Sequence, residues 1–338
     1  MKEEFDPMYT TLKKLLPQKP SISGREGGVR DIIADLMRPL VDEVKTDAMG
    51  NLICLKRGSA TAPKKVLLAA HMDEIGFMVN FVEDNGWLRV APIGGIDFIA
   101  ACSAEVTFEN GTKGVLVSDA DCKAADIKAD KCYVDIGARS KKEAERHVQI
   151  GDCCALTPGA TKLLGSRVCG RPLDDRIGCV CMIEIARRMP HPADDIYYVF
   201  SVQEEVGCRG ARPAAFEIAP DLALIYDVTA TGDVPGAKPM AVKLGEGVAV
   251  KIKDSSVICD AALVSELMDT AKREKIKAQP EILTFGGTDT SAVQMTGYGC
   301  RAGALSLPCR YIHSGVEMLD MADAEAAVAL TVAYLGGV

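Results

Sequence analysis

The sequence predicts an α/β fold that is interrupted by a β-rich insert. Helical and strand patterns alternate over the first 70 residues and again from about residue 165, as in a sheet covered by helices. Between about residues 75 and 160, short strand-like runs are separated by Gly, Asn and Asp, which is typical of antiparallel hairpins. We therefore divide the chain into residues 1–73 and 164–338, forming one α/β domain, and an inserted β-rich domain of residues 74–163.

The first part is expected to contain two helices followed by two strands. Residues 9–16 read as helical, and residues 21–40 combine a serine in capping position with apolar residues at helical spacing. Residues 51–58 and 64–71 read as strands. The second of these, "KKVLLAAH", is almost wholly apolar after its lysines, which predicts a strand covered on both faces.

The insert is expected to consist of strands and one helix. Residues 76–90, 104–117 and 131–137 carry the strand patterns, with "ENGTKG" at 109–114 as a hairpin turn. Residues 140–150 read as the helix.

The third part returns to alternating helices and strands. Its expected helices are 174–189, 208–216, 260–274 and one from about residue 320, and its expected strands are 196–202, 222–227, 247–252 and 301–307.

Composition argues against several classes of protein. The net charge of −8 and the pI near 5.2 disfavour nucleic acid or an anionic membrane as a partner. No secretory signal and no run of about 18 apolar residues is visible, so we expect a cytoplasmic location. The thirteen cysteines are scattered without a C-x-x-C pair, which predicts mostly buried thiols in a reducing compartment.

Metal-ligating residue types follow the expected strands. Ligands of open α/β sheets bind at the carboxyl ends of the strands, where the sequence places His71 and Asp73, Glu204 and Glu205, Asp227, and His313. Asp174 precedes the helix at 174–189 and alone would be read as its N-cap. His71 alone would be read as a core histidine. Together, however, so many carboxylates at one sheet edge would raise one another's pKa, and a cation removes that conflict.

The donor types indicate which metal the site would hold. Imidazole nitrogen and carboxylate oxygen without thiolates suit zinc, cobalt or manganese in a catalytic site. There are more carboxylates than one tetrahedral ion needs, which indicates two ions with a bridging carboxylate. No H-E-x-x-H, Walker A, G-x-G-x-x-G or G-x-S-x-G motif is present. A glycosidase could use Glu204 as one of its two carboxylates, but would leave His71 and His313 unexplained.

An ordered set of motifs gives the chain a family resemblance. "AAHMDEIGFMV", "RPLDDRIG", "VQEEVGCRGA", "TFGGTDTSAV" and "RYIHSGVEM" occur in this order and span nearly the whole chain. In this the chain resembles the glutamyl-aminopeptidase/tetrahedral (TET) aminopeptidase family of dinuclear metallopeptidases, some of which are labelled cellulase M. The resemblance implies a three-layer α/β/α metallopeptidase catalytic domain with an inserted β-barrel-like dimerisation domain, and homo-oligomers from dimer to dodecamer.

The resemblance also implies a role for each residue at the strand ends. His71 and Asp227 would bind one divalent ion, Glu205 and His313 would bind the other, Asp174 would bridge them, Glu204 would be the general acid/base, and Asp73 would orient His71. The ions would be zinc or cobalt, with manganese as a further candidate. The implied reaction removes N-terminal residues from peptides with a metal-activated water.

Some expectations remain open at this point. Residues 285–292, "FGGTDTSA", would form a turn before a helix and wall the substrate pocket. A deacylase or deacetylase could use the same site on another amide, a glycosidase would be insensitive to chelators, and a scaffold with a degenerate site would bind no metal. The preferred N-terminal residue cannot be read from the sequence.

Overall fold

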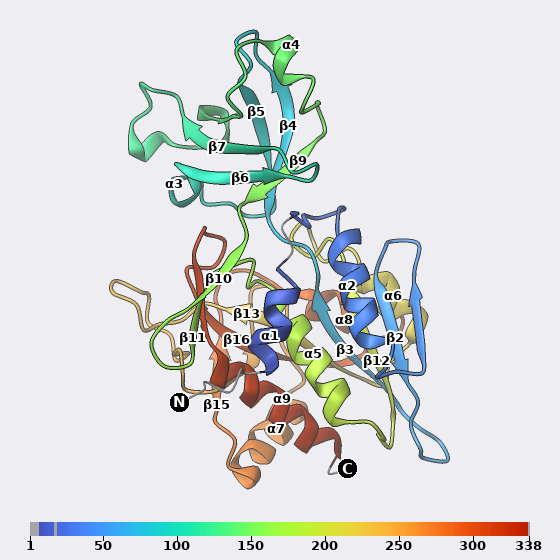
Figure 1. Cartoon of the computed structure of the whole chain (residues 1–338). Helices are drawn as coiled ribbons and strands as arrows, with labels where there is room; N and C mark the ends of the chain where they lie inside the picture. Colours follow the sequence, from blue (N-terminus) through green and yellow to red (C-terminus); the bar gives the residue numbers. More distant parts are fainter. Residues whose placement is uncertain (1–6, 17–18, 337–338) are drawn as a thin grey trace, which may run out of the picture.

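The computed structural model describes residues 7–16 and 19–336, which build one large sheet and one closed barrel (Figure 1). Within these residues the sheet has eleven strands. They are β1 (Glu43–Thr46), β2 (Leu52–Lys56), β3 (Lys65–His71), β10 (Gly159–Lys162), β11 (Arg167–Arg171), β12 (Asp195–Ser201), β13 (Leu222–Thr229), β14 (Val248–Lys253), β15 (Ala278–Ile282), β16 (Arg301–Arg310) and β17 (Glu317–Asp320).

The centre of the sheet is parallel. The order is β1-β2-β12-β3-β13-β16-β17-β11-β10, with β14 and β15 branching from β16. The four adjacent strands β12, β3, β13 and β16 run parallel to one another, and the last residue of β12, Ser201, lies opposite His71 at the end of β3. The carboxyl ends of these strands therefore meet at one edge of the sheet.

Helices cover both faces of the sheet, as predicted. Along β3, Val66, Leu68 and Ala70 pack on one face and Leu67 and Ala69 on the other. The first face carries α1 (Pro7–Lys14), α2 (Gly27–Met37), α5 (Arg176–Arg188), α7 (Ala261–Glu274) and α9 (Met321–Gly336), and the second carries α6 (Ala211–Ile218) and α8 (Asp289–Gln294). The α/β/α prediction is thus confirmed, and the double burial of β3 explains its apolar sequence.

The predicted barrel is also present, at the top of Figure 1. Its strands close in the order β4-β5-β8-β7-β6-β9 around a core of their own. They are β4 (Gly76–Val82), β5 (Leu88–Ile93), β6 (Ala104–Phe108), β7 (Lys113–Ser118), β8 (Cys132–Asp135) and β9 (Cys153–Leu156). Short helices at Phe98–Ala101 (α3) and Lys141–Ala144 (α4), with single 3₁₀ turns at Ala124–Asp126 and Ala129–Lys131, lie between them.

The chain enters the barrel after β3 and leaves it before β10. Strand β10 lies within residues 74–163 of the predicted insert, yet it pairs with β11 in the larger sheet. The division of the chain at residues 73 and 163 therefore remains a proposal.

Two predicted helices are shorter in the structure. The helix expected at 21–40 begins at Gly27, and its N-cap is Glu26, which makes no side-chain cap. No serine caps it, because the Ser23 hydroxyl instead donates to Asp73. The helix expected at 140–150 is limited to α4, and the residues after Ala144 form turns that lead through Gly151 (φ +92°) into β9.

All thirteen cysteines are free thiols, and eight of them are buried. The expectation that most cysteines are small buried residues is therefore confirmed.

Candidate metal centre and active site

The fold brings the predicted residues to one edge of the sheet. His71 is the last residue of β3, Asp227 lies in β13, and Glu204 and Glu205 follow β12. His313 lies between β16 and β17. These strands are neighbours in the sheet, which is why positions more than 200 residues apart can face one another.

The two adjacent glutamates can serve one site because the backbone turns just before them. Strand β12 ends at Ser201, and Gln203 has a positive φ of +57°. The amides of Gly207 and Cys208 both donate to the Glu204 carbonyl at 2.8 Å. The pair thus lies in a tight turn, not in an extended strand where neighbours point to opposite faces.

Asp174 lies between the two histidines. Its Oδ1 is 3.1 Å from Nε2 of His71, and its Oδ2 is 3.3 Å from Nε2 of His313. The same His313 nitrogen is 3.2 Å from Glu205 Oε2, and the His71 nitrogen is 4.0 Å from Asp227 Oδ1. The donor atoms of His71, Asp174 and Asp227 therefore lie within 4.8 Å of one another, and so do those of Asp174, Glu205 and His313. These two trios share Asp174. A carboxylate with one oxygen in each trio has the arrangement of a ligand that bridges two ions.

The electrostatics of this cluster fit a cation. Burial lowers the pKa of His313, but hydrogen bonds from its imidazole to Asp174 and Glu205 outweigh this and raise it to about 11. The pKa of His71 is likewise raised well above its usual value, against burial, by Asp174 and Asp73. Burial raises the pKa of Asp227 well above its usual range. Positive charge among these carboxylates is thus strongly favoured, and a divalent ion would supply it in place of protons.

The first aspartate of the "LDDR" segment faces the histidines, and the second does not. Asp175 is the N-cap of α5 and accepts a hydrogen bond from the Gly178 amide at 3.0 Å. The capping role considered for Asp174 is therefore filled by its neighbour, which leaves both oxygens of Asp174 for the cluster.

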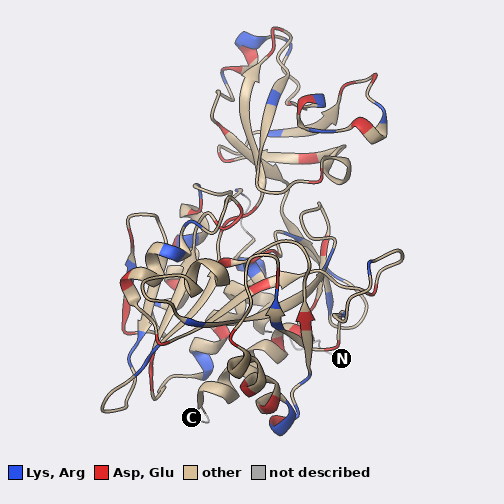
Figure 2. Ribbon diagram, turned by 180° about the vertical axis from the view of Figure 1, so that it is seen from behind, with Lys and Arg blue, Asp and Glu red and all other residues tan. Residues whose placement is uncertain are grey.

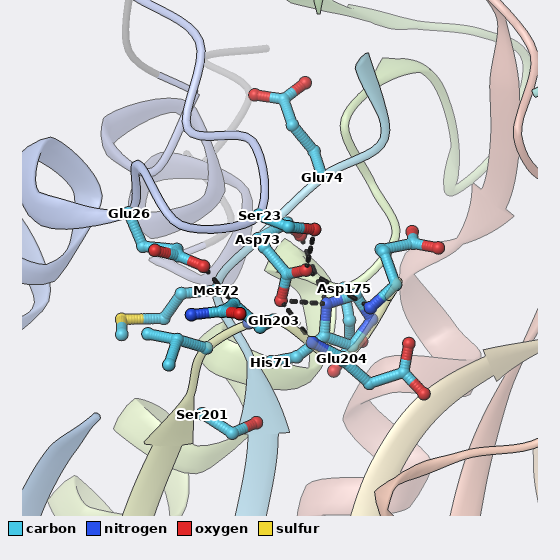
Figure 3. Close-up of polar contacts among 12 residues, drawn as sticks. Ser23, Glu26, His71, Met72, Asp73, Glu74, Asp175, Ser201, Gln203 and Glu204 are labelled. Atoms are coloured by element: carbon cyan, nitrogen blue, oxygen red, sulfur yellow. Dashed lines mark hydrogen bonds and ion pairs between the residues drawn. The ribbon is translucent and has the colours of Figure 1, made fainter. Parts of the chain in front are cut away.

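Asp73 contacts both His71 and the glutamate turn, the turn after β12 that carries Glu204 and Glu205 (Figure 3). Its Oδ1 lies 3.4 Å from His71 Nδ1 and accepts the Glu204 amide at 3.0 Å. Its Oδ2 accepts the Ser23 hydroxyl at 2.6 Å and the Glu205 amide at 3.2 Å. The side chain is completely buried. The Asp73 carboxylate thus holds the backbone of both glutamates, and together with the Asp73 carbonyl oxygen, 3.1 Å from His71 Nδ1, it faces the His71 ring.

Glu317 is a supporting residue that the sequence reasoning missed. Its Oε2 accepts the amides of Leu173 and Asp174 at 2.6 and 3.1 Å, and its Oε1 accepts the His313 amide at 3.3 Å. Burial raises the pKa of this carboxyl group to about 7. The only signal was its place four residues after His313 in "RYIHSGVEM", because an acceptor for backbone amides has no spacing rule of its own.

Glu204 belongs to neither of these two trios, although it lies with Cys208 and Asp289 in a separate group of possible donors that does not include Asp174. It lines the cavity beside the centre, and its Oε1 accepts the Cys208 thiol at 3.2 Å. Burial raises the pKa of Glu204 well above its usual range. A carboxylate with a raised pKa is a stronger base, so this side chain is suited to accept a proton from a water molecule.

A cavity of about 680 Å³ opens beside the centre. The cavity is lined by both histidines and by the four carboxylates of Asp174, Asp227, Glu204 and Glu205. Residues 285–288 line it as well, and α8 follows them. The expected turn before a helix is therefore confirmed as a wall of this cavity.

The profile of the M42 glutamyl aminopeptidase family matches residues 50–330. The chain belongs to this family. The resemblance deduced from the ordered motifs is thereby confirmed, and the family makes the chain a peptide hydrolase of the aminopeptidase type.

Individual relatives agree over almost their whole length. A putative aminopeptidase of Acetivibrio thermocellus is 42% identical over 97% of this chain and 98% of its own. The structure of an aminopeptidase from the archaeon Desulfurococcus kamchatkensis has a TM-score of 0.93 at 34% identity, covering 98% of this chain and 95% of the other. A TET peptidase of Pyrococcus horikoshii, which can assemble into a tetrahedron or a large octahedral shell, has a TM-score of 0.86 at 34% identity, covering 97% and 99%.

Proposed function

We propose that this M42 family member is an aminopeptidase that uses two divalent ions per chain, with Glu204 as its general acid/base. One ion would be held by His71, Asp174 and Asp227, and the other by Asp174, Glu205 and His313. The observation that carries the proposal is the position of Asp174, with one oxygen toward each histidine. The nitrogen and oxygen donors suit zinc or cobalt, with manganese as a further candidate.

The residues of the site would have separate roles in hydrolysis. When bound, the ions would polarise the scissile carbonyl and lower the pKa of the attacking water. Glu204 would take a proton from that water and later give it to the leaving amine. Asp73 would keep the Glu204 backbone and the His71 ring in place through the contacts at 3.0 and 3.4 Å. The free α-amino group of a peptide would be attracted by the carboxylates of the centre, which restricts cleavage to the N-terminus.

A three-substrate assay tests this function. Leucyl-p-nitroanilide, N-acetyl-leucyl-p-nitroanilide and a p-nitrophenyl cellobioside would be offered to protein treated with EDTA and to protein resupplied with zinc, cobalt or manganese. We expect cleavage of the free aminoacyl compound alone, and only after metal is returned. Release of acetate from the acetylated compound would favour the deacylase alternative. Cellobioside cleavage that persists in EDTA would favour the glycosidase.

We also propose that the chain forms a homo-oligomer between a dimer and a dodecamer, in the cytoplasm. The assembly of the Pyrococcus horikoshii relative supports the homo-oligomer. The free thiols support the cytoplasmic location. Over residues 7–16 and 19–336, no helix is long and apolar enough to cross a membrane. Basic and acidic residues are interspersed over both parts of the molecule (Figure 2), which agrees with peptides rather than nucleic acid as the partner. Light scattering of the purified protein would give the number of subunits.

A further inference from the structure

The walls of the cavity beside the metal centre bear on which peptides the protein cleaves. The inference that follows rests on the proposed aminopeptidase function. In such a reaction the carbonyl carbon of the first residue lies at the centre. The side chain of that residue branches from the adjacent Cα, so it must lie in the 680 Å³ cavity.

The walls of this cavity are largely apolar. Val228 follows Asp227, and Ile312 precedes His313, so apolar side chains begin directly beside the proposed ligands. The remaining apolar side chains of the wall are Ala230, Val234, Leu283, Phe285 and the thiol-bearing Cys208 and Cys309.

The apolar surface continues into a second cavity. This adjoining space of about 440 Å³ shares Ala230, Thr231, Leu283 and Phe285 with the first. Pro239, Met240 and Ile282 extend its apolar wall. Leu283 and Phe285 therefore lie where the two cavities adjoin and line both of them.

On the wall of the first cavity, no charge of a described residue outside the centre is left without a partner for a charged substrate side chain. Among residues 7–16 and 19–336, Arg310 is the only charged residue outside the centre that lines the first cavity. Its Nη2 and Nε lie 2.6 and 3.2 Å from the two carboxylate oxygens of Asp233. This pairing is strong, since hydrogen bonds from Arg310 lower the pKa of Asp233 to about 2 against the effect of burial. Lys238 lines only the second cavity.

The backbone holds Phe285 in position. The Leu283 amide donates to the Lys253 carbonyl at 3.0 Å, and the Ser255 amide donates to the Gly286 carbonyl at 3.2 Å. Bonds on both sides of Phe285 thus anchor it to the end of β14, although its side chain is 53% exposed. An exposed aromatic ring on an anchored segment in the wall of a largely apolar cavity is suited to contact a ligand.

We propose that this cavity selects peptides whose first residue has a large apolar side chain, such as Leu, Met or Phe, and that Phe285 is a specificity-determining residue. A charged first residue would lose its hydration without gaining a partner. An apolar side chain gains contact with Phe285 and Leu283 and removes apolar surface from water.

A panel of aminoacyl-p-nitroanilides tests the proposal on the metal-replete protein. We expect kcat/KM for the Leu, Met or Phe compound to exceed that for the Glu and Lys compounds by about 100-fold or more. A preference for Glu or Lys would overturn the selectivity while leaving the aminopeptidase function intact. Failure to cleave any member of the panel would overturn both.

Substitution of Phe285 separates a specificity role from a structural one. Phe285→Ala should raise KM for the Leu and Phe compounds about tenfold, leave kcat within about twofold, and leave the Ala compound unaffected. Phe285→Leu should restore most of the lost affinity. The matched control is Phe216→Ala, because Phe216 is 70% exposed on α6 and lines neither cavity. Equal effects on the Ala and Phe compounds, or equal effects of the control, would contradict the assignment.

Discussion

The substitution Asp73→Asn removes one charge and at least one hydrogen-bond acceptor at the point where His71 and the glutamate turn meet. The two shapes are nearly identical, so no cavity is created. In the native protein the Glu204 amide donates to Oδ1 and the Glu205 amide to Oδ2. An asparagine can offer an oxygen to only one of them, and its NH₂ group must face the other N–H.

The expected losses in stability and in metal affinity follow from these contacts. A hydrogen bond to a charged group is worth about 1.5–3 kcal/mol, so the free energy of unfolding of the metal-free protein should fall by about that amount. Loss of a carboxylate that orients a ligating histidine typically lowers metal affinity about 10–100-fold. Both effects should appear together, because the same carboxylate holds the histidine ring and the glutamate backbone.

Urea unfolding of the metal-free protein and competition with a chelator would measure the two quantities. Asp323→Asn is the matched control. Asp323 is 1% exposed, and its two oxygens accept the amides of Gly245 and Gly247 at 2.8 and 2.7 Å, with no contact to the proposed ligands. It should lose stability but keep metal affinity. If Asp73→Asn binds metal as tightly as the control does, Asp73 does not position the centre.

Three further predictions concern other buried or paired charges. Glu317→Gln should weaken binding of one ion about tenfold, seen as a weaker second step in a metal titration, and two unchanged steps would count against its supporting role. Lys251→Met leaves the carboxylate of Glu281, its buried ion-pair partner, without a cation. It should lower the free energy of unfolding by about 3–5 kcal/mol, as measured in urea, with kcat unchanged, whereas wild-type stability would refute the estimate. Asp233, whose pKa of about 2 is held below the unfolded value of 3.8 by Arg310, stabilises the fold fully above that value and loses its contribution as pH falls toward 2. Asp233→Asn should therefore flatten acid unfolding between pH 4 and 2, and an unaltered acid transition would contradict the pairing.

The sequence was most informative about features that follow from residue periodicity or from the order of strands and helices along the chain. The apolar run of β3 predicted a strand buried on both faces, and the sheet packs it in that way. The convergence of His71, Glu205 and Asp227 could be anticipated because parallel strands end at a common edge. The short barrel strands were recognisable from their turns.

Other features depend on tertiary contacts that leave no local pattern. Ser23 looks like a helix cap in the sequence, but its hydroxyl donates to Asp73, 50 residues away. Glu317 is one acidic residue among many until its backbone partners at Leu173 and His313 are seen. The neutral walls of the cavity could not be predicted either, because the charge of Arg310 is cancelled by a residue 77 positions earlier.

The metal content and turnover of Glu204→Gln separate proton transfer by Glu204 from metal binding. Glu204 lies outside both trios that share Asp174, and we propose that it transfers the proton. The variant should therefore retain two ions per chain by elemental analysis and lose at least about 100-fold in kcat on leucyl-p-nitroanilide. Asp174→Asn should lower the metal content itself. Near-native turnover by Glu204→Gln would show that Glu204 does not transfer the proton, and loss of an ion from the variant would show that Glu204 is a metal ligand.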